Sequence, residues 1–319
     1  MDKVRVAVIG AGALANQMHY PSLVSFDDVE VVACCDLLPD RLARTAERFG
    51  IAHTYQDAGA MLAEQQPDAV WIMVAPHHLY DLAATVLEAG VHLFVEKPPG
   101  ITLAQTRNMA ALAERHGCLT MCGFNRRFLP LLNACLDPVR ARGPLEQISV
   151  TFYKHHFAGD YFRGAVDILT SDVIHAVDLV RWLGGEPRRV AASTRCTGGE
   201  TYPTSWNALI EFESGAVGTL HTCWTVGKRF HSAEFHAKGI SCYTDLEHEG
   251  TVWADGRNEP LASFRAAELV GSDEPHRCLG FWQEDRHFID CVRSGTLPLS
   301  NLGDAVRTME LVEQIRRGA

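Results

Sequence analysis

The first 125 or so residues alternate short apolar runs with amphipathic stretches of helix length, and this alternation restricts the folds open to the chain. The run VRVAVIG (4–10) is apolar throughout, which is typical of a parallel strand buried on both faces. Further runs end at Asp36, Pro76, Pro99 and Asn125, and helical stretches separate them. This order predicts a doubly wound parallel sheet with right-handed crossovers.

The pattern changes near Gly123, where long strand-like segments replace the strand–helix alternation. These segments cover residues 145–157, 188–196, 206–226 and 232–247, and ESGAVG (213–218) marks a hairpin. Helical stretches cover 172–185, 281–295 and 301–318. We therefore expect two domains. Residues 1–122 form the parallel sheet, and residues 123–319 form an α+β domain with a large, mostly antiparallel open sheet. The C-terminal helix is expected to pack back on the first domain.

Composition excludes several classes of partner. The formal net charge is −10 and basic runs are missing, which argues against a nucleic-acid partner. An apolar run of about 18 residues, as a membrane-spanning helix needs, is also missing. The start MDKVRVAVIGAG lacks the apolar core of a signal peptide. The ten cysteines are scattered without a CxxC pair, which predicts free thiols in a reducing cytoplasm.

The segment VIGAGALA carries a possible phosphate-binding loop. Gly10, Gly12 and Ala15 have the spacing GxGxx(G/A), directly after a strand and before a helix. Gly10 permits the tight turn, and Gly12 lets the backbone approach a pyrophosphate at the helix N-terminus. The next strand ends in Asp36, which would accept hydrogen bonds from ribose hydroxyls and repel a 2′-phosphate. The pattern predicts an NAD-binding Rossmann domain, with NADP disfavoured; a glycine-rich turn beside a surface Asp is the alternative.

In the segment VEKPPG, the apolar run GVHLFV (90–95) is followed by a carboxylate, an ammonium group and two prolines. Ligands of open α/β sheets gather at the carboxyl ends of strands, where Glu96 and Lys97 are expected. A lysine acts as a base near neutral pH where burial or positive charge lowers its pKa from about 10.4, and in its protonated form it stabilises a developing alkoxide. We expect a cis Lys97–Pro98 bond. A surface salt bridge is the alternative interpretation.

Several motifs together resemble the Gfo/Idh/MocA oxidoreductase family, which includes glucose–fructose oxidoreductase and inositol dehydrogenase. They are GAGALA near the N-terminus, VAP at the end of one strand, EKP at the end of the next, GFNRRF (123–128) and HAVD (175–178). The resemblance covers essentially the whole chain. It implies a Rossmann domain followed by an open antiparallel sheet that often forms the subunit interface. It also implies hydride transfer between a nicotinamide and a carbinol carbon of a sugar, cyclitol or related polyol.

The resemblance also implies roles for individual residues. Glu96 and Asn125 would lie by the nicotinamide and its ribose, while Lys97 and His175 would exchange the substrate proton. With the loop motif, the predicted cofactor residues are Gly10, Gly12, Ala13, Leu14, Asp36, Leu37, Arg41, Ala75, Pro76, His78, Glu96, Lys97 and Asn125. The predicted catalytic residues are Lys97, His175 and Asp172, and the predicted substrate residues are Arg127, His155, Tyr161 and Asp178. No metal is expected.

The chain departs from the family pattern at two places. The usual Asp four residues before the catalytic His is Ser171 here, and Asp172 lies three before His175. Either Asp172 takes the acid's role, or Ser171 replaces the acid and leaves His175 as the main proton relay. The alternative for Asp172 is a helix N-terminal acid that only favours the dipole. A satisfied core histidine is the alternative for His175. Tyr80 stands where the family commonly has His.

The strand segment FYKHH places Tyr153 and His155 on one face and Lys154 and His156 on the other. His155 and the following Tyr161 are predicted to meet the substrate; a solvated strand edge is the alternative.

Two other functions are compatible with the same motifs. One is an enzyme that uses bound NAD transiently, for glycoside cleavage or epimerisation. The other is a non-catalytic sensor of cofactor or sugar. The presence of the lysine of EKP argues against a sensor. The expected partners are a polyhydroxylated small molecule and further copies of the chain, as a homodimer or homotetramer through the second-domain sheet; nucleic acid and membrane are not expected.

Overall fold

A computed structural model describes residues 3–157 and 161–318 of the chain. The contacts divide it into two compact units, and the chain passes between them more than once. Unit 1 holds residues 1–125, 275–277 and 281–306, and unit 2 holds residues 126–274, 278–280 and 307–319. The expected division at residue 122, with the C-terminal helix packed back on the first domain, stays a prediction. By contacts, residues 281–306 belong to unit 1, whereas the chain from Arg307 onward belongs to unit 2.

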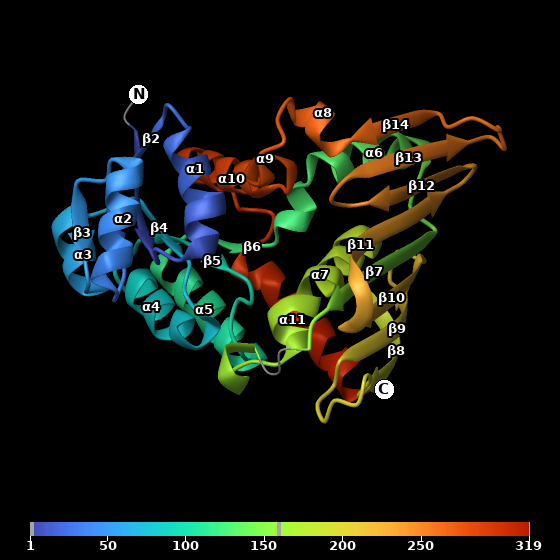
Figure 1. The fold of residues 1–319 in the computed structure, drawn as a ribbon, viewed down its shortest axis with the longest axis horizontal. Coiled ribbons are helices and arrows are strands. Elements are labelled where there is room, and N and C mark those ends of the chain that lie inside the picture. The colour runs from blue at the N-terminus through green and yellow to red at the C-terminus, as the bar shows by residue number, and fades with distance from the viewer. Residues whose placement is uncertain (1–2, 158–160, 319) are drawn as a thin grey trace. The chain divides into compact units, whose positions relative to one another are not determined.

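Unit 1 is built on the predicted parallel sheet (Figure 1). Its six strands lie in the order β3-β2-β1-β4-β5-β6. They are β1 (Val4–Ile9), β2 (Val29–Cys35), β3 (His53–Tyr55), β4 (Ala69–Ile72), β5 (His92–Glu96) and β6 (Thr120–Gly123). The helices are α1 (Tyr20–Val24), α2 (Pro39–Phe49), α3 (Ala58–Gln65), α4 (Pro76–Glu88), α5 (Leu103–His116), α9 (Pro275–Cys278) and α10 (Phe281–Ser294). The order reverses between β1 and β4, which is where ligands of such sheets bind.

An aromatic core holds α10 in unit 1. Trp71 on β4 stacks on Phe94 of β5 with ring centroids 5.5 Å apart, and Phe288 of α10 meets Trp71 edge-on at 5.2 Å. All three side chains are fully buried. Aromatic pairs of this geometry add about 0.5–1.5 kcal/mol to the burial of their area. This apolar face explains why residues so late in the sequence belong to unit 1.

Unit 2 is an α+β domain with a mostly antiparallel sheet of eight strands, as predicted. The order is β14-β13-β12-β11-β7-β10-β9-β8, in which β7 and β10 form a parallel pair. The strands are β7 (Gln147–His155), β8 (Pro187–Arg195), β9 (Ser205–Phe212), β10 (Val217–Cys223), β11 (Thr225–Ala237), β12 (Ile240–Asp245), β13 (Glu249–Ala254) and β14 (Ala262–Arg265). The helices include α6 (Pro130–Arg142), α7 (Ile174–Gly184) and α8 (Ala266–Val270). The helix α11 (Leu302–Arg317) begins in unit 1 and belongs to unit 2 from Arg307 onward.

Two glycines let α7 pack closely on the sheet. A Cβ at Gly184 would lie 2.3 Å from the Phe212 ring, and one at Gly218 would lie 2.7 Å from it. Phe212 is almost fully buried between them. The hairpin predicted at ESGAVG joins β9 and β10, which pair in antiparallel register.

Two helices begin with a π-helical turn that the sequence pattern does not reveal. The segment η1 (Ala15–His19) precedes α1, and η4 (Leu169–Val173) precedes α7. Pro21 lies in the first turn of α1 and lacks the N–H that a continuous α-helix would use. Such turns are frequent at functional sites.

All ten cysteines carry free thiols, as the absence of a CxxC pair predicts, although Cys196 is exposed. Among the helices that the structure describes, none has both the length and the apolar character needed to cross a membrane.

Candidate active site

The glycine loop after β1 has the geometry that the motif requires. Gly10 has a φ of +117°, and a Cβ there would lie 2.3 Å from the carbonyl oxygen of Met73. Only glycine fits this position, because a side chain would meet backbone. Gly12 is different: a Cβ there would meet no atom within 4 Å among the described residues. The space over Gly12 is what a pyrophosphate approaching the backbone needs.

Asp36 connects β2 to this loop. Its carboxylate accepts one hydrogen bond from Ala11 N at 2.7 Å and another from Leu38 N at 2.9 Å. An ionised carboxylate has about four acceptor positions, so these two bonds leave capacity for ribose hydroxyls.

A pocket of about 620 Å³ opens beside the loop. Seven of the predicted cofactor residues line it, namely Gly10, Gly12, Asp36, Leu37, Arg41, Ala75 and His78. They follow β1, β2 and β4 or lie in the first turns of α2 and α4, and the parallel sheet brings the ends of these three strands to one edge. Ala13 and Leu14 follow Gly12 and are exposed, whereas Pro76 is the buried first residue of α4. The residues present therefore fit a dinucleotide, and their cofactor roles stay predictions.

The end of β5 carries Glu96 and Lys97. The peptide bond between Lys97 and Pro98 is cis, as predicted. The Lys97 side chain is half-buried. Glu96 is buried, with one carboxylate oxygen accepting from Lys97 N at 3.0 Å and the other 3.1 Å from His19 Nε2. Its predicted contact with the nicotinamide ribose stays a prediction, as does that of Asn125, which is buried at the end of unit 1.

His19 bridges two acids in the interior of unit 1. Its Nδ1 lies 3.0 Å from Asp285, which also accepts a hydrogen bond from Trp71 Nε1 at 2.8 Å. Burial lowers the pKa of His19, but Asp285 and Glu96 outweigh burial and raise it well above its usual value. A protonated imidazole donates from both nitrogens, which fits a ring held between two carboxylates.

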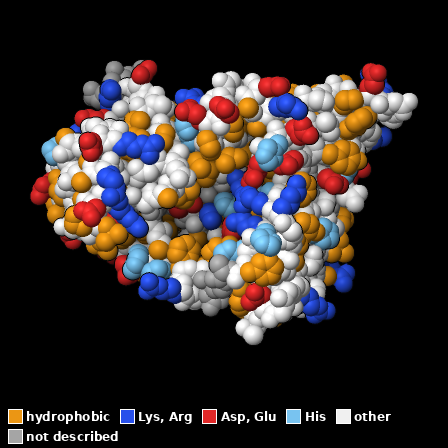
Figure 2. All heavy atoms as spheres, in the orientation of Figure 1, with side chains coloured by type: hydrophobic (Ala, Val, Ile, Leu, Met, Phe, Trp, Pro, Cys, Tyr) orange, Lys and Arg blue, Asp and Glu red, His pale blue; other side chains and the backbone are white. Residues whose placement is uncertain are grey.

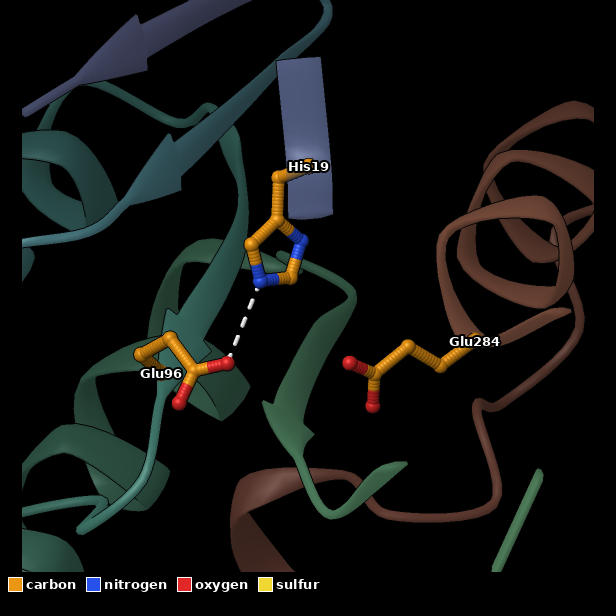
Figure 3. Close-up of side chains that lie close together, drawn as sticks. All are labelled: His19, Glu96 and Glu284. Atoms are coloured by element: carbon orange, nitrogen blue, oxygen red, sulfur yellow. Dashed lines mark hydrogen bonds and ion pairs between the residues drawn. The ribbon is translucent and has the colours of Figure 1, made fainter. Parts of the chain in front are cut away.

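Glu284 of α10 points toward the same place (Figure 3). The possible ligand atoms of His19, Glu96 and Glu284 all lie within 4.8 Å of one another, and within the described residues these three are the group close enough to share a metal ion. Because His19 already bridges Glu96 and Asp285, we interpret the group as a buried ionic network. The expectation of no metal stays a prediction.

In unit 2, Arg127 and Asp178 form a buried bidentate ion pair. Arg127 Nε and Nη2 donate to the two carboxylate oxygens at 2.8 and 2.6 Å, and Thr308 Oγ1 of α11 donates to Asp178 at 2.8 Å. Both side chains of the pair are at most 3% exposed. This arrangement joins α7 and α11 to the segment after β6, so we interpret the pair as support. The predicted substrate contacts of both residues stay predictions.

Asp172 lies in the π-turn η4 and is not a helix cap. The N-cap of α7 is Val173, which makes no side-chain capping bond. Asp172 instead pairs with Lys154 of β7 and accepts a hydrogen bond from Tyr161 Oη at 3.0 Å. Tyr161 in turn accepts from Trp224 Nε1 at 3.0 Å. Asp172 also lies in the first turn of η4, so both roles open from the sequence, the acid and the residue that favours the helix dipole, stay predictions.

Asp172, His175 and Asp178 are spaced by three along the chain but have different surroundings. Asp172 pairs with Lys154 and Asp178 with Arg127, while His175 is buried in the first turn of α7. The π-turn before α7 changes the direction of the Asp172 side chain relative to regular helical spacing.

Lys154 rather than His155 lies on the helix-facing side of β7. Phe152 on that side is fully buried, whereas His155 is exposed and bonded through Nδ1 to Val226 O at 2.8 Å. The sequence VTFYK already indicates this orientation. Val150, Phe152 and Lys154 are alternate residues of the strand and therefore lie on the same face of the sheet. The substrate role of His155 stays a prediction.

Sequence reasoning missed the partners that surround Lys154. Arg229 and His231 come from β11, Arg126 from the 3₁₀ helix η2 (Asn125–Phe128) and Glu247 from the turn between β12 and β13. Arg229 Nε lies 3.1 Å from both oxygens of Glu247, and Arg126 Nη2 lies 3.5 Å from the same carboxylate. These residues are far apart in sequence and follow no recognisable motif, so the fold alone reveals the group.

Comparison with known proteins supports the family assignment. The family model for the oxidoreductase family with an NAD-binding Rossmann fold (Gfo/Idh/MocA) matches residues 4–124, and the model for the Gfo/Idh/MocA C-terminal domain matches residues 146–239. D-apiose dehydrogenase of Paraburkholderia graminis is 30% identical over 98% of this chain and 87% of its own.

Two further relatives extend the comparison. The NAD⁺-dependent scyllo-inositol 2-dehydrogenase of Bacillus subtilis is 27% identical over 97% of this chain and 92% of its own. The crystal structure of GenD2 from gentamicin A biosynthesis in complex with NAD matches with a TM-score of 0.83 and 25% identity, covering 100% of this chain and 95% of that one. With the loop, the pocket and both domain matches in place, the chain belongs to the Gfo/Idh/MocA family of oxidoreductases.

Proposed function

We propose that the protein is an NAD-dependent dehydrogenase that moves a hydride between nicotinamide and a carbinol carbon of a sugar, cyclitol or related polyol. The observation that carries the proposal is the pocket beside Gly12, which combines room for a pyrophosphate with the Asp36 carboxylate. NAD is favoured over NADP because a carboxylate at this place repels a 2′-phosphate. The named activities of the D-apiose and inositol dehydrogenases support the substrate class.

The chain's own residues have the following parts. The cofactor supplies a hydride acceptor when it is bound. Gly10 and Gly12 shape the loop that receives its pyrophosphate, and Asp36 accepts from its ribose. Lys97 takes the proton from the substrate hydroxyl as the carbinol hydride leaves, and His175 exchanges that proton onward. Asp172 orders Lys154 and Tyr161, and we assign it a positioning part.

The test is a screen of NAD reduction against sugars and cyclitols, followed by the Lys97→Met variant. We expect kcat to fall by about 10²–10⁴-fold in this variant while NAD binding is retained, because general acid–base groups contribute about that much. Lys238→Met, an exposed lysine on the β11–β12 turn, is the matched control. A Lys97→Met enzyme with full activity on an identified substrate would sink the assignment.

The same screen separates the two rival functions. Steady NADH production argues against transient use of NAD for glycoside cleavage or epimerisation, whereas turnover without net NADH favours it. Binding of cofactor without turnover of any substrate favours a sensor.

We also propose a cytoplasmic homodimer or homotetramer that forms through the eight-stranded sheet. Leu209 of β9 and Tyr243 of β12 are 49% and 46% exposed, and each alternates with buried neighbours that face the helices of unit 2. Exposed apolar side chains on one sheet face favour burial against a second copy. Light scattering of the wild-type chain and of the Tyr243→Lys variant tests this proposal by measuring the mass of each assembly in solution. A monomeric wild type contradicts the proposal, and so does a variant whose assembly has the same mass as the wild type.

A further inference from the structure

The inward side chains at one end of β7 and β11 form a basic group within unit 2. The register pairs His231 of β11 with Phe152 of β7, and the next inward residues toward this end are Arg229 and Lys154. Lys154 Nζ and Arg229 Cζ lie 5.3 and 5.0 Å from the centroid of the Phe152 ring. Two cationic groups thus converge on one aromatic side chain. Figure 2 shows Lys and Arg side chains gathered with His side chains near this part of the sheet.

Cations and acids pair within the group. Arg126 and Arg229 both pair with Glu247, and Lys154 pairs with Asp172. Burial raises the pKa of Glu247, but Arg229 and Arg126 hold it below its usual value, so this acid is ionised. Cationic side chains that converge in a half-buried place favour a ligand that brings its own negative charge.

Arg229 offers donors to such an anion. Its Nε and Nη2 are directed to Glu247, while Nη1 donates to no group among the described residues. The side chain is 40% exposed, and that of Lys154 is 21% exposed. A guanidinium held on one edge by a carboxylate presents its remaining N–H groups in a fixed direction, as recognition of a carboxylate or phosphate requires.

His231 lies on the buried side of the same group, against Phe152. It is 1% exposed and stacks on Phe152 at 4.1 Å, and neither ring nitrogen has a hydrogen-bond partner within the described part of the chain. Burial lowers the pKa of His231, and Arg126, Arg229 and Lys154 lower it further. The ring is therefore neutral and has one N–H group that is able to donate a hydrogen bond. A buried imidazole without a partner costs free energy, which a bound ligand or its ordered water would recover.

We propose that Arg229, Lys154 and His231 form a subsite that receives an anionic group of the substrate, either a carboxylate or a phosphate, so that the enzyme prefers polyhydroxylated acids to neutral polyols. This inference rests on the proposed function and deepens it. Tyr161 donates to Asp172, the acid that pairs with Lys154, so its half-buried ring lies beside the subsite and adds an aromatic surface suited to a carbon chain that carries hydroxyls.

The test measures equilibrium binding to the NAD-loaded full chain by calorimetry, with three matched pairs of probes. The pairs are gluconate against glucitol, galacturonate against galactose, and glucose 6-phosphate against glucose. We expect the charged member to bind at least about tenfold more tightly, with an advantage that shrinks as salt rises. Preference confined to the first two pairs identifies a carboxylate subsite, and preference confined to the third identifies a phosphate subsite.

Two variants connect the preference to the proposed residues. Arg229→Gln should lose most of the advantage of the charged member, and Arg229→Lys should keep part of it. Arg142→Gln is the matched control, because Arg142 is also 40% exposed and pairs bidentately with an acid, Asp255, away from the group. Thermal unfolding of each variant shows whether it is folded.

Three outcomes overturn the subsite. They are equal or weaker binding of the charged members, no saturable binding of any charged member, and an Arg229→Gln variant that keeps the full advantage. None of them affects the hydride-transfer assignment, which is judged separately by NADH production from neutral sugars or cyclitols.

Discussion

The carboxylate of Asp36 accepts a hydrogen bond from the backbone N of Ala11 at 2.7 Å, so the end of β2 holds the glycine loop that follows β1. The residue that we expect to select the cofactor therefore also shapes the loop that receives it. Substitutions of Asp36 should therefore change both the cofactor preference and the conformation of the loop.

Asp36→Ser should reduce the preference for NAD over NADP. The variant removes the negative charge that repels a 2′-phosphate and weakens the acceptor for ribose hydroxyls. We expect the ratio of kcat/KM for NAD to that for NADP to fall about tenfold or more, which corresponds to about 1.4 kcal/mol. Steady-state kinetics with both cofactors measures it. Asp40→Ser, an exposed acid in the first turn of α2, is the control and should leave the ratio unchanged.

The two glycines of the loop should fail in different ways. Gly12→Ala places its Cβ in open space, so the protein should keep its stability while KM for NAD rises about tenfold or more because the pyrophosphate loses its approach to the backbone. Gly10→Ala puts an alanine at a strained φ with its Cβ 2.3 Å from Met73 O, so the free energy of unfolding should fall by about 1–3 kcal/mol. Urea unfolding and cofactor titration of both variants distinguish these effects. A stable Gly10→Ala protein would contradict the loop geometry.

Asp178→Ala should destabilise the fold rather than only weaken substrate binding. The change leaves the guanidinium of Arg127 buried without its bidentate partner, and breaking a buried pair in this way costs about 3–5 kcal/mol. Urea unfolding measures the loss. Replacing both residues together, as in Arg127→Met with Asp178→Leu, should cost less than the sum of the two single changes. A normal unfolding free energy with a raised KM would instead support a substrate role for Asp178.

The His19 network should stabilise unit 1 more at low pH than at high pH. The pKa of His19 is raised in the folded protein, so the folded state holds this proton more tightly than the unfolded chain does. The stabilisation is complete below the unfolded-state pKa, about 6.5, and is lost as pH rises through the folded-state pKa. The free energy of unfolding of wild type minus that of His19→Gln should therefore be larger at about pH 6 than at about pH 9. A difference that grows with pH would refute a protonated His19.

The sheet of unit 1 was predictable because its determinants are local. Buried parallel strands are uniformly apolar, and glycine spacing with a following acid reports the shape of one turn, so Gly10, Gly12 and Asp36 were found from the sequence alone. The cis bond before Pro98 was a hypothesis from the two prolines after Lys97, and only the structure shows it. A change of pattern predicts a boundary near residue 122, and only the contacts show which late residues, 281–306, belong to unit 1.

The environment of the candidate catalytic acids was decided by tertiary structure. One π-turn separates Asp172 from the helical register of His175 and Asp178, and a backbone change of this kind leaves no clear mark on side-chain periodicity. The residues around Lys154 come from β11, from the 3₁₀ helix after β6 and from the turn after β12, and sheet pairing brings β11 beside β7. The amino-acid sequence by itself determined the family, the two sheets and the cofactor loop, because these depend on neighbouring residues. Only the fold decided which charges meet at Lys154, because electrostatic partnership depends on distance in space.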